Sequence, residues 1–242
     1  MKPPGAAICF FHSSTNAPTV GFLDDLKRQA DAAKAQQTTD IGALERNTAL
    51  ADLACKTAFN YLAALAQQLN VLLPRSKRSY RLDKRHVFDT LQLCDFRADA
   101  RHKRLRGADV FDHVVLHYQL RSGQHLRLVK DFLPEIEKLE SRLRQSGAQV
   151  QSEAVRKAET AKLHEMRYEL TADFRASVRV TPDHDGGRVR FQLVNLDGFE
   201  TVTVEFPAFE IGAARMDELA RWLLGETHGF LKAGQQLQRV EA

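Results

Sequence analysis

The chain has 242 residues, of which 43% are hydrophobic and 27% are charged, and its formal net charge at pH 7 is +4. These values are typical of globular proteins with a packed core and exclude a wholly disordered chain. No run approaches the roughly 20 consecutive apolar residues that span a bilayer, so we expect no membrane span.

The cysteines and the start of the chain indicate a reducing compartment. The three cysteines, Cys9, Cys55 and Cys94, are odd in number and form no C-x-x-C pair, which argues against a disulfide framework or a structural zinc site. The apolar run over residues 6–11 is shorter than the roughly 7–15 residues of a secretion signal. We therefore expect a cytoplasmic protein.

The N-terminal third is expected to be disordered and then helical. Residues 1–20 are rich in Pro, Ser and Thr without periodicity, which predicts a disordered N-terminus, and Val20 is an alternative start. Residues 21–74 then form a helical region. A short helix over residues 22–35 is followed by a polar break at residues 36–39 and by a second helix that ends before Pro74. The region is thus a helical hairpin or a long helix.

The second helix carries an apolar seam with the 3-4 spacing of a coiled coil. The seam residues that are candidates for self-association are Leu44, Ala51, Cys55, Ala58, Leu62, Leu65 and Leu69. Two interpretations stay open. The seam packs inside the molecule, with the first helix folding back on it as a helical hairpin, or it pairs with a second copy of the chain as a coiled coil. The internal interpretation is favoured because the seam spans only about four heptads.

Residues 75–147 are predicted to form a first unit of antiparallel sheet and helix. The strand-like runs cover residues 79–82, 88–100, 110–120 and 124–132, with a hairpin turn at residues 121–124. A helix starts at Pro134 and ends at Gly147.

Residues 163–233 are predicted to form a second unit of the same kind. Residues 148–162 are polar and are expected to be a linker, or a helix with a poor apolar face, and residues 234–242 a frayed tail. The strands cover residues 163–180, 188–196 and 199–206, with turns at residues 182–187 and 197–198. A helix follows over residues 213–224.

The two units show a short sequence similarity. The segment Asp-Phe-Arg-Ala occurs at residues 95–98 and again at residues 173–176, and similar turns and helices follow each copy. We therefore predict an α+β fold with an internal duplication, arranged by analogy with TATA-binding-protein-like folds. Fold alone does not imply function.

No motif for catalysis, a cofactor or a metal is present. The sequence lacks a Walker A loop, G-x-G-x-x-G, H-E-x-x-H and G-x-S-x-G. His113 and His117 share one face of a predicted strand, but a third ligand is missing, since His125 is expected on the opposite face. We predict no catalytic residue, no cofactor, no metal and no small-molecule ligand.

Basic residues are concentrated in one segment. Residues 75–106 hold eleven Lys and Arg against four Asp, a net charge of +7, so the rest of the chain carries −3. Our candidates for phosphate contact are Arg75, Lys77, Arg78, Arg101, Lys103, Arg104 and Arg106. Tyr80, Phe88 and Phe96 lie between them and are suited to stack on bases, although Phe88 and Phe96 also fit the core face of a strand. The alternative, which we favour, is that these charges protect an exposed strand edge.

Two functional hypotheses follow. In the first, the chain is a non-enzymatic interaction or scaffold protein that binds a protein partner or itself. In the second, it binds nucleic acid through residues 75–106. We favour the first because it requires the fewest special residues; an enzyme is a third class that no motif supports.

Overall fold

The computed structural model describes residues 22–157 and 162–241. The chain divides into two units, Met1–Gly42 and Ala43–Ala242. In the first unit the described residues, 22–42, are helical throughout and almost all exposed. The predicted disorder of residues 1–20 lies outside the described residues.

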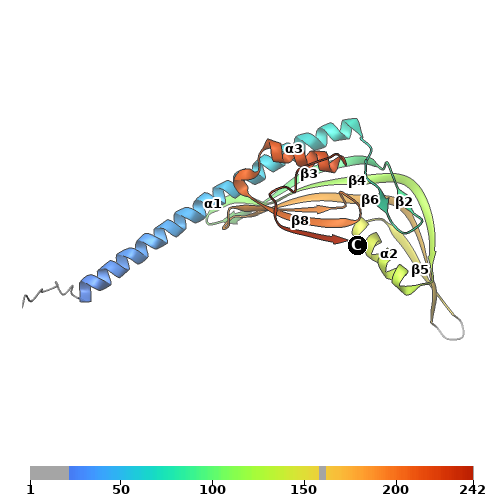
Figure 1. The fold of residues 1–242 in the computed structure, drawn as a ribbon, viewed down its shortest axis with the longest axis horizontal. Helices are drawn as coiled ribbons and strands as arrows, with labels where there is room; N and C mark the ends of the chain where they lie inside the picture. Colours follow the sequence, from blue (N-terminus) through green and yellow to red (C-terminus); the bar gives the residue numbers. More distant parts are fainter. Residues whose placement is uncertain (1–21, 158–161, 242) are drawn as a thin grey trace, which may run out of the picture. The chain divides into compact units, whose positions relative to one another are not determined.

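The described residues form a mixed α+β fold, as predicted, with three α-helices, a seven-stranded antiparallel sheet and a small two-stranded sheet (Figure 1). The helices are α1 (Phe22–Leu72), α2 (Leu133–Ser146) and α3 (Ala213–Leu223). The strands are β1 (Tyr80–Arg81), β2 (Val87–Phe88), β3 (Gln92–Leu105), β4 (Ala108–Lys130), β5 (Val150–Arg156), β6 (Leu163–Asp183), β7 (Arg188–Val194), β8 (Glu200–Pro207) and β9 (Gln235–Glu241). None of the described helices has an apolar stretch long enough to cross a bilayer.

Helix α1 is one continuous helix, so the predicted break at residues 36–39 is wrong. The hydroxyls of Thr38 and Thr39 donate to the carbonyl oxygens of Lys34 and Ala35, one turn earlier, at 2.9 Å. These bonds satisfy the hydroxyls within the helix, where the same residue types often favour a cap or a turn. Of the two forms proposed for this region, the long helix is the one observed.

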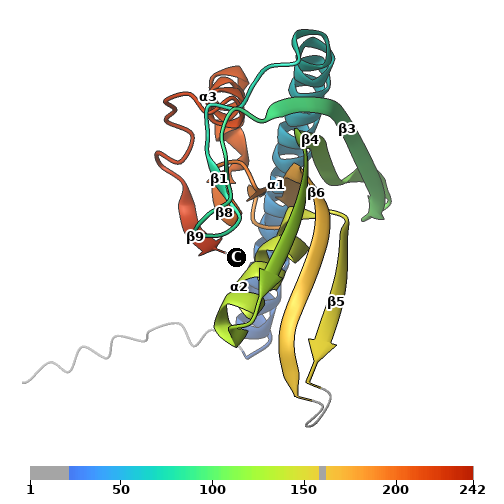
Figure 2. The ribbon, with the colours of Figure 1, turned by 90° about the vertical axis from the view of Figure 1, so that its right-hand side faces the viewer.

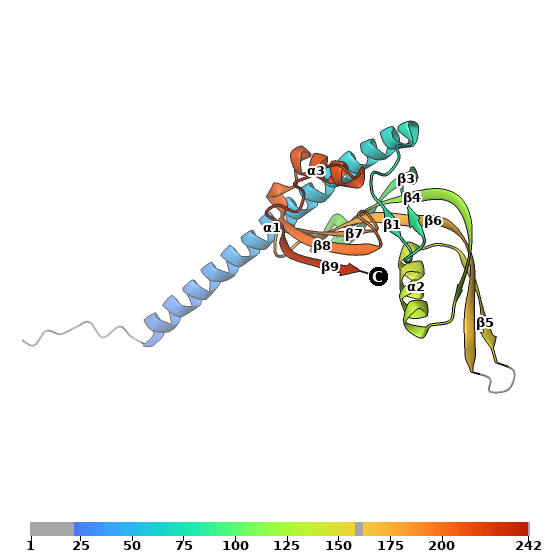
Figure 3. The ribbon, with the colours of Figure 1, turned by 45° about the vertical axis from the view of Figure 1, so that its right-hand side comes forward.

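The large sheet is organised around the two long strands β4 and β6. Its strand order is β3-β4-β6-β7-β8-β9, and β5 also pairs with β6. One edge of β6 pairs with β4, while the other edge pairs with β5 near one end and with β7 near the other (Figures 2 and 3). Every pairing in the sheet is antiparallel, so one face of the sheet continues from β3 to β9.

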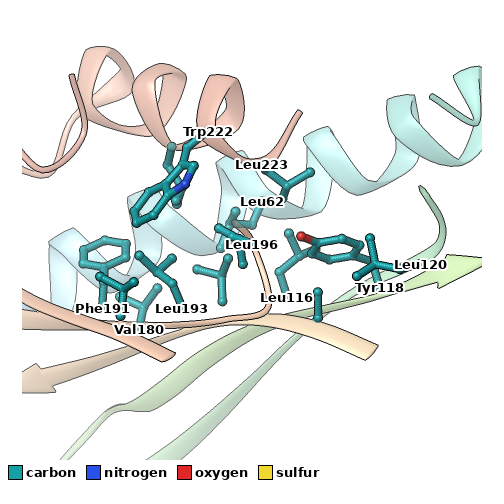
Figure 4. Close-up of a cluster of buried hydrophobic side chains, with 14 of the residues drawn as sticks. Leu62, Leu116, Tyr118, Leu120, Val180, Phe191, Leu193, Leu196, Trp222 and Leu223 are labelled. Atoms are coloured by element: carbon teal, nitrogen blue, oxygen red, sulfur yellow. The ribbon is translucent and has the colours of Figure 1, made fainter. Parts of the chain in front are cut away.

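The hydrophobic core lies on one face of this sheet, which we call the inner face. Residues 43–72 of α1, together with α2 and α3, pack there, and Figure 4 shows Leu62 of α1 and Trp222 of α3 above Phe191 and Leu193 of the sheet. The hydroxyl of Tyr61 on α1 donates to Asp217 on α3 at 2.6 Å. The helix surface towards the sheet is made of small side chains, which allows close approach: Ala51, Ala54, Cys55 and Ala58 are 0–2% exposed.

The two shorter helices and two of the turns are as predicted. Helix α2 begins beside Pro134 and ends at Gly147, which has φ 64°, a left-handed conformation that glycine adopts easily. Helix α3 covers most of the predicted range and buries Met216, Leu219, Ala220 and Leu223. Both turns that flank β7 also lie where turn residues predicted them.

The predicted hairpin at residues 121–124 is wrong, because β4 continues through it. Arg121 pairs with Asp173 and His125 with Thr171, so three residues of β4 oppose one of β6 and form a bulge. The carboxylate of Asp173 accepts the backbone N–H groups of Ser122 and Gly123 at 3.0 and 3.1 Å. Gly123 has φ 67°, a left-handed conformation that the bulge uses and that was expected to belong to a turn.

Two segments predicted to be irregular contain strands. The predicted linker, residues 148–162, includes β5, and the predicted frayed tail, residues 234–242, includes β9. Every residue of β9 is exposed, and β5 is almost as exposed, so neither strand has the alternating apolar pattern that marks a strand in a sequence. Backbone pairing to β6 and β8 forms them.

The predicted internal duplication is not confirmed. The two expected units are parts of one seven-stranded sheet. The first contributes β3 and β4 before α2, whereas the second contributes β6, β7 and β8 before α3. The similar segments do have a shared local role, which is described below.

We predict that Leu62→Ala lowers the free energy of unfolding by about 2–5 kcal/mol, because Leu62 is 0% exposed and truncation leaves a cavity. Leu53→Ala, on the same helix but 60% exposed, is the control and should change it by less than about 1 kcal/mol. Urea denaturation measures both. Equal effects would contradict this packing of α1.

Two buried tyrosines should respond in opposite directions to loss of the hydroxyl. Tyr80 donates to the carbonyl oxygens of Asn195 and Leu196 at 3.0 and 3.2 Å, whereas the Tyr118 hydroxyl has no partner among the described residues. Tyr80→Phe should destabilise the protein by about 1–3 kcal/mol, and Tyr118→Phe should leave stability unchanged or raise it. A destabilised Tyr118→Phe protein in thermal denaturation would show that its hydroxyl is satisfied.

Candidate anion-binding site

The face of the sheet opposite to the core, which we call the outer face, is polar. Residues 43–72 of α1, together with α2 and α3, pack on the other face (Figure 2). Along β6 the even-numbered residues from Tyr168 to Pro182 are buried, and the odd-numbered residues between them are exposed or half-buried. This alternation follows from the two-residue period of a strand. The outer face therefore presents the side chains available for binding.

Four arginines of the outer face have no ion pair with a described carboxylate. Arg97 and Arg101 lie on β3, and Arg175 and Arg179 lie on β6. Other arginines of this face are neutralised. Arg121 pairs with Asp95 at 2.5 Å, and Arg188 and Arg190 both pair with Glu205. The four uncompensated cations lie on either side of β4.

A hollow lies between β3, β4 and β6, and Asn70 and Leu73 at the end of α1 also line it. This depression, which we call the β3–β6 hollow, has a volume of about 750 Å³. Its polar lining includes Asp95, Arg97, Asp99, His117, Gln119 and Arg175. Arg97 is directly opposite His117, and Gln119 is directly opposite Arg175. With strands about 4.8 Å apart and about 3.3 Å per residue, the Cα atoms of the two arginines are roughly 12 Å apart, within joint reach of one small anion.

The repeated Asp-Phe-Arg-Ala segments position these two arginines. Residues 95–98 and 173–176 lie on the two strands that flank β4. In each segment the phenylalanine is buried in the core and the arginine is exposed on the outer face. The aspartates both contact β4 at its bulge, Asp95 through Arg121 and Asp173 through the N–H groups of residues 122 and 123.

Arg97 follows a bulge in β3. The register of β3 shifts between Cys94 and Arg97, and Asp95 takes a positive φ of 56°. The side chain of Asn70, on α1, accepts the N–H of Phe96 and donates to its carbonyl oxygen, both at 2.8 Å. Helix α1 thus provides the hydrogen bonds that the bulged backbone would otherwise lack, and the bulge aims Arg97 at the hollow.

Arg175 lies in a gap between strands and is supported in a similar way. On this edge of β6, β5 begins with Val150 opposite Leu170, and β7 ends with Val194 opposite Ser177. The side chain of Asn195 donates to the carbonyl oxygen of Arg175 at 2.7 Å and to that of Gln145 at 3.1 Å. Asn195 is fully buried, and its side chain supplies to the Arg175 carbonyl the hydrogen bond that a neighbouring strand would otherwise give.

His117 lies between the opposing charges of the hollow. Partial burial lowers its pKa, Asp99 acts in the opposite direction, and Arg179 and Arg175 lower it further. The net pKa is below the ordinary value of 6.5. The ligand-free hollow therefore favours the neutral imidazole at pH 7, because partial burial disfavours the charged ring and the neighbouring guanidinium groups repel a further cation.

The sequence-predicted phosphate residues do not form one surface. Arg75 forms an isolated bridge with Gln92, at the start of β3, whereas Arg101, Lys103, Arg104 and Arg106 lie in its last residues and in the turn to β4. Nine residues of strand, about 30 Å, separate Arg75 from Arg101. Several of the candidates are ion-paired: Lys77 with Glu226, Arg78 with Asp197, Lys103 with Asp112 and Arg106 with Asp185.

The four arginines of the outer face without an ion pair to a described carboxylate differ from the candidates that were chosen for the high net charge of residues 75–106. Arg101 alone is common to both sets. Arg97 was within the basic segment, but Arg175 and Arg179 were not. The repeated Asp-Phe-Arg-Ala segment contains both Arg97 and Arg175, but in the sequence it indicated duplication and not a binding site.

The aromatic residues proposed to stack on bases are in the core. Tyr80 is 1% exposed, and Phe88 and Phe96 are each 5% exposed. Phe96 stacks on Tyr118, and Phe88 contacts the edge of Phe174. The expectation of base stacking is wrong, because all three side chains point to the inner face. For Phe88 and Phe96 the alternative, a core position in a strand, is the one observed.

The proposed self-association seam lies largely against the molecule's own sheet. Ala51, Cys55, Ala58, Leu62 and Leu69 are at most 3% exposed, and Leu44 and Leu65 are half-buried. Burial raises the pKa of the Cys55 thiol to about 12. The five buried side chains are inaccessible to a second copy in the folded unit.

The histidines and carboxylates of the described residues form no group of three or more that could hold a metal ion. His113 contacts Asp112 through Nδ1 at 2.8 Å, and His125 contacts Thr171 at 3.2 Å. His113 and His117 share the outer face.

No protein-family model matches this chain, and neither a curated protein nor a solved structure is significantly similar to it. Functional inference therefore starts from the geometry of the outer face.

The electrostatics of the hollow can be tested on the ligand-free protein by NMR titration of the His117 ring. We expect Arg179→Gln to raise the pKa of His117, because a repelling cation is removed, and Asp99→Asn to lower it, because an attracting anion is removed. If neither substitution moved the pKa, these side chains would not lie near His117 in solution.

Proposed function

We propose that this chain is a non-enzymatic nucleic-acid-binding protein that contacts backbone phosphates with the outer face of its sheet. The observation that carries the proposal is the set of four arginines without carboxylate partners, two on each strand that flanks β4. Arginine is well suited to phosphate because its planar fork donates two parallel hydrogen bonds.

The composition of the outer face favours contacts to the phosphate backbone over contacts to bases. The outward residues of β6, β7 and β8 include no Phe, Tyr or Trp, so the stacking platform of single-strand-binding proteins is absent from these strands. Polar side chains that suit phosphate and sugar oxygens lie beside the arginines, such as Ser177, Gln192 and Thr203. A duplex or a folded RNA is the partner that this chemistry fits best.

The alternative of a protein partner or a homodimer loses its main support, because most of the proposed seam is buried in the core. A cytoplasmic location, favoured by the cysteines, belongs to the present proposal and is compatible with access to nucleic acid. No catalytic role is proposed.

Fluorescence anisotropy with labelled duplex DNA, duplex RNA and single-stranded RNA over a salt series tests the proposal. We expect binding that weakens steeply with salt, because bound phosphates release counterions. The variant Arg101→Ala/Arg179→Ala should reduce the slope of log affinity against log salt by about two, roughly one per lost phosphate contact.

The matched control is Arg81→Ala/Arg85→Ala. It removes the same charge from the basic segment, but from β1 and the turn that follows it, which lie outside the large sheet. Equal loss of slope in both double variants would favour net charge over the outer face, and absence of binding at low salt would refute the proposal. Circular dichroism checks that each variant is folded.

A further inference from the structure

The hollow differs from the rest of the outer face in combining two cations with a neutral group that can gain a proton. Arg97 and Arg175 line it from opposite sides, and His117 and Gln119 lie between them on β4. Of these side chains, His117 alone changes charge near neutral pH.

We propose that the β3–β6 hollow is a phosphate subsite in which Arg97 and Arg175 hold the anion and His117 takes up one proton from solvent as the phosphate binds. The proposal rests on the proposed function in one respect: nucleic acid is the source of the phosphate. The chemistry is that of any phosphate group, whether internal to a nucleic-acid strand, at its end, or free.

The charges that face His117 account for the coupling. On β3 they are Arg97 and Asp99, and on β6 they are Arg175 and Arg179; Asp95 also lines the hollow but is paired with Arg121. Without an anion, partial burial and the arginines of β6 disfavour the imidazolium and Asp99 favours it, with a net pKa below the ordinary value. A phosphate placed between Arg97 and Arg175 reverses the local field and accepts a hydrogen bond from the protonated ring.

Gln119 and Asp99 determine where in the hollow a phosphate can bind. Gln119 is half-buried next to His117 on the same face and can donate its amide N–H to a phosphate oxygen. Asp99 carries a negative charge at one side of the hollow and repels an anion that approaches the histidine from that side. The favourable position for a phosphate is therefore towards Gln119 and Arg175, away from Asp99.

The consequence is measurable as proton linkage. Binding should strengthen as the pH falls through the pKa values of the free and bound states, with a slope of at most about tenfold in affinity per pH unit for one proton. The uptake comes from the buffer, so calorimetry in two buffers with different ionisation enthalpies reports the number of protons directly.

The experiment follows the His117 ring by NMR in the full-length protein, free and with three probes. The probes are inorganic phosphate, a short RNA duplex with 5′-phosphates and the same duplex with 5′-hydroxyls. We expect each probe that occupies the hollow to raise the pKa of His117. A rise with the phosphorylated duplex alone identifies the terminal phosphate as the source, and an equal rise with both duplexes identifies internal phosphates.

Three variants separate the subsite from the wider face. His117→Gln keeps a hydrogen-bond donor but cannot titrate, so binding should persist while proton uptake disappears. Arg97→Ala/Arg175→Ala should abolish the rise in the pKa of His117, and Arg81→Ala/Arg85→Ala should leave both the rise and the uptake unchanged.

The outcomes distinguish this inference from the proposed function. Salt-dependent duplex binding without any change in the pKa of His117 would overturn the subsite and leave the nucleic-acid proposal standing. A rise with inorganic phosphate but no binding of any duplex would support the subsite and overturn the nucleic-acid proposal. Uptake of a proton that persists in His117→Gln would show that another group titrates, which also overturns the subsite.

Discussion

The pairing of β4 with β6 is the constraint on which the rest of this structure depends. The two strands pair from Val114 with Val180 to Lys130 with Met166, interrupted only by the bulge at residues 122–124. Because they are longer than their neighbours, different strands occupy the edge of β6 at its two ends. The same pairing aligns the inward side chains of both strands, so α1, α2 and α3 can share one core.

The two arginines of the hollow lie where regular strand pairing fails. Beside Arg97, a bulge interrupts the pairing of β3 with β4. Beside Arg175, one edge of β6 has no partner among the described strands, because this stretch lies between the part that pairs with β5 and the part that pairs with β7. In both places the backbone is satisfied by an asparagine side chain from another element, Asn70 or Asn195. An unsatisfied buried backbone group is costly, so these two side chains fix positions that the sheet alone would leave undefined.

The two faces of the sheet differ in composition because side chains alternate between them along each strand. The large apolar residues of the inner face, including the aromatic residues of the basic segment, pack in the core with the helices. The outer face is left with arginines, short polar side chains and a few carboxylates. Such a face is suited to bind a hydrated anion and unsuited to stack on an aromatic ring.

The sequence by itself determined the α+β class, the positions of α2 and α3, and the turns around β7, because glycine, proline and periodic apolar residues act over a few neighbouring positions. It also marked the repeated Asp-Phe-Arg-Ala segment. Tertiary structure alone decided that residues 121–124 form a bulge, that β5 and β9 are strands, and that the α1 seam faces the molecule's own sheet. In each case the deciding partner is distant in the chain: Asp173 for the bulge, β6 and β8 for the exposed strands, and the inner face for Cys55 and Leu62. The candidate site follows the same rule, since Arg97 and Arg175 are brought together only by the strand that separates them.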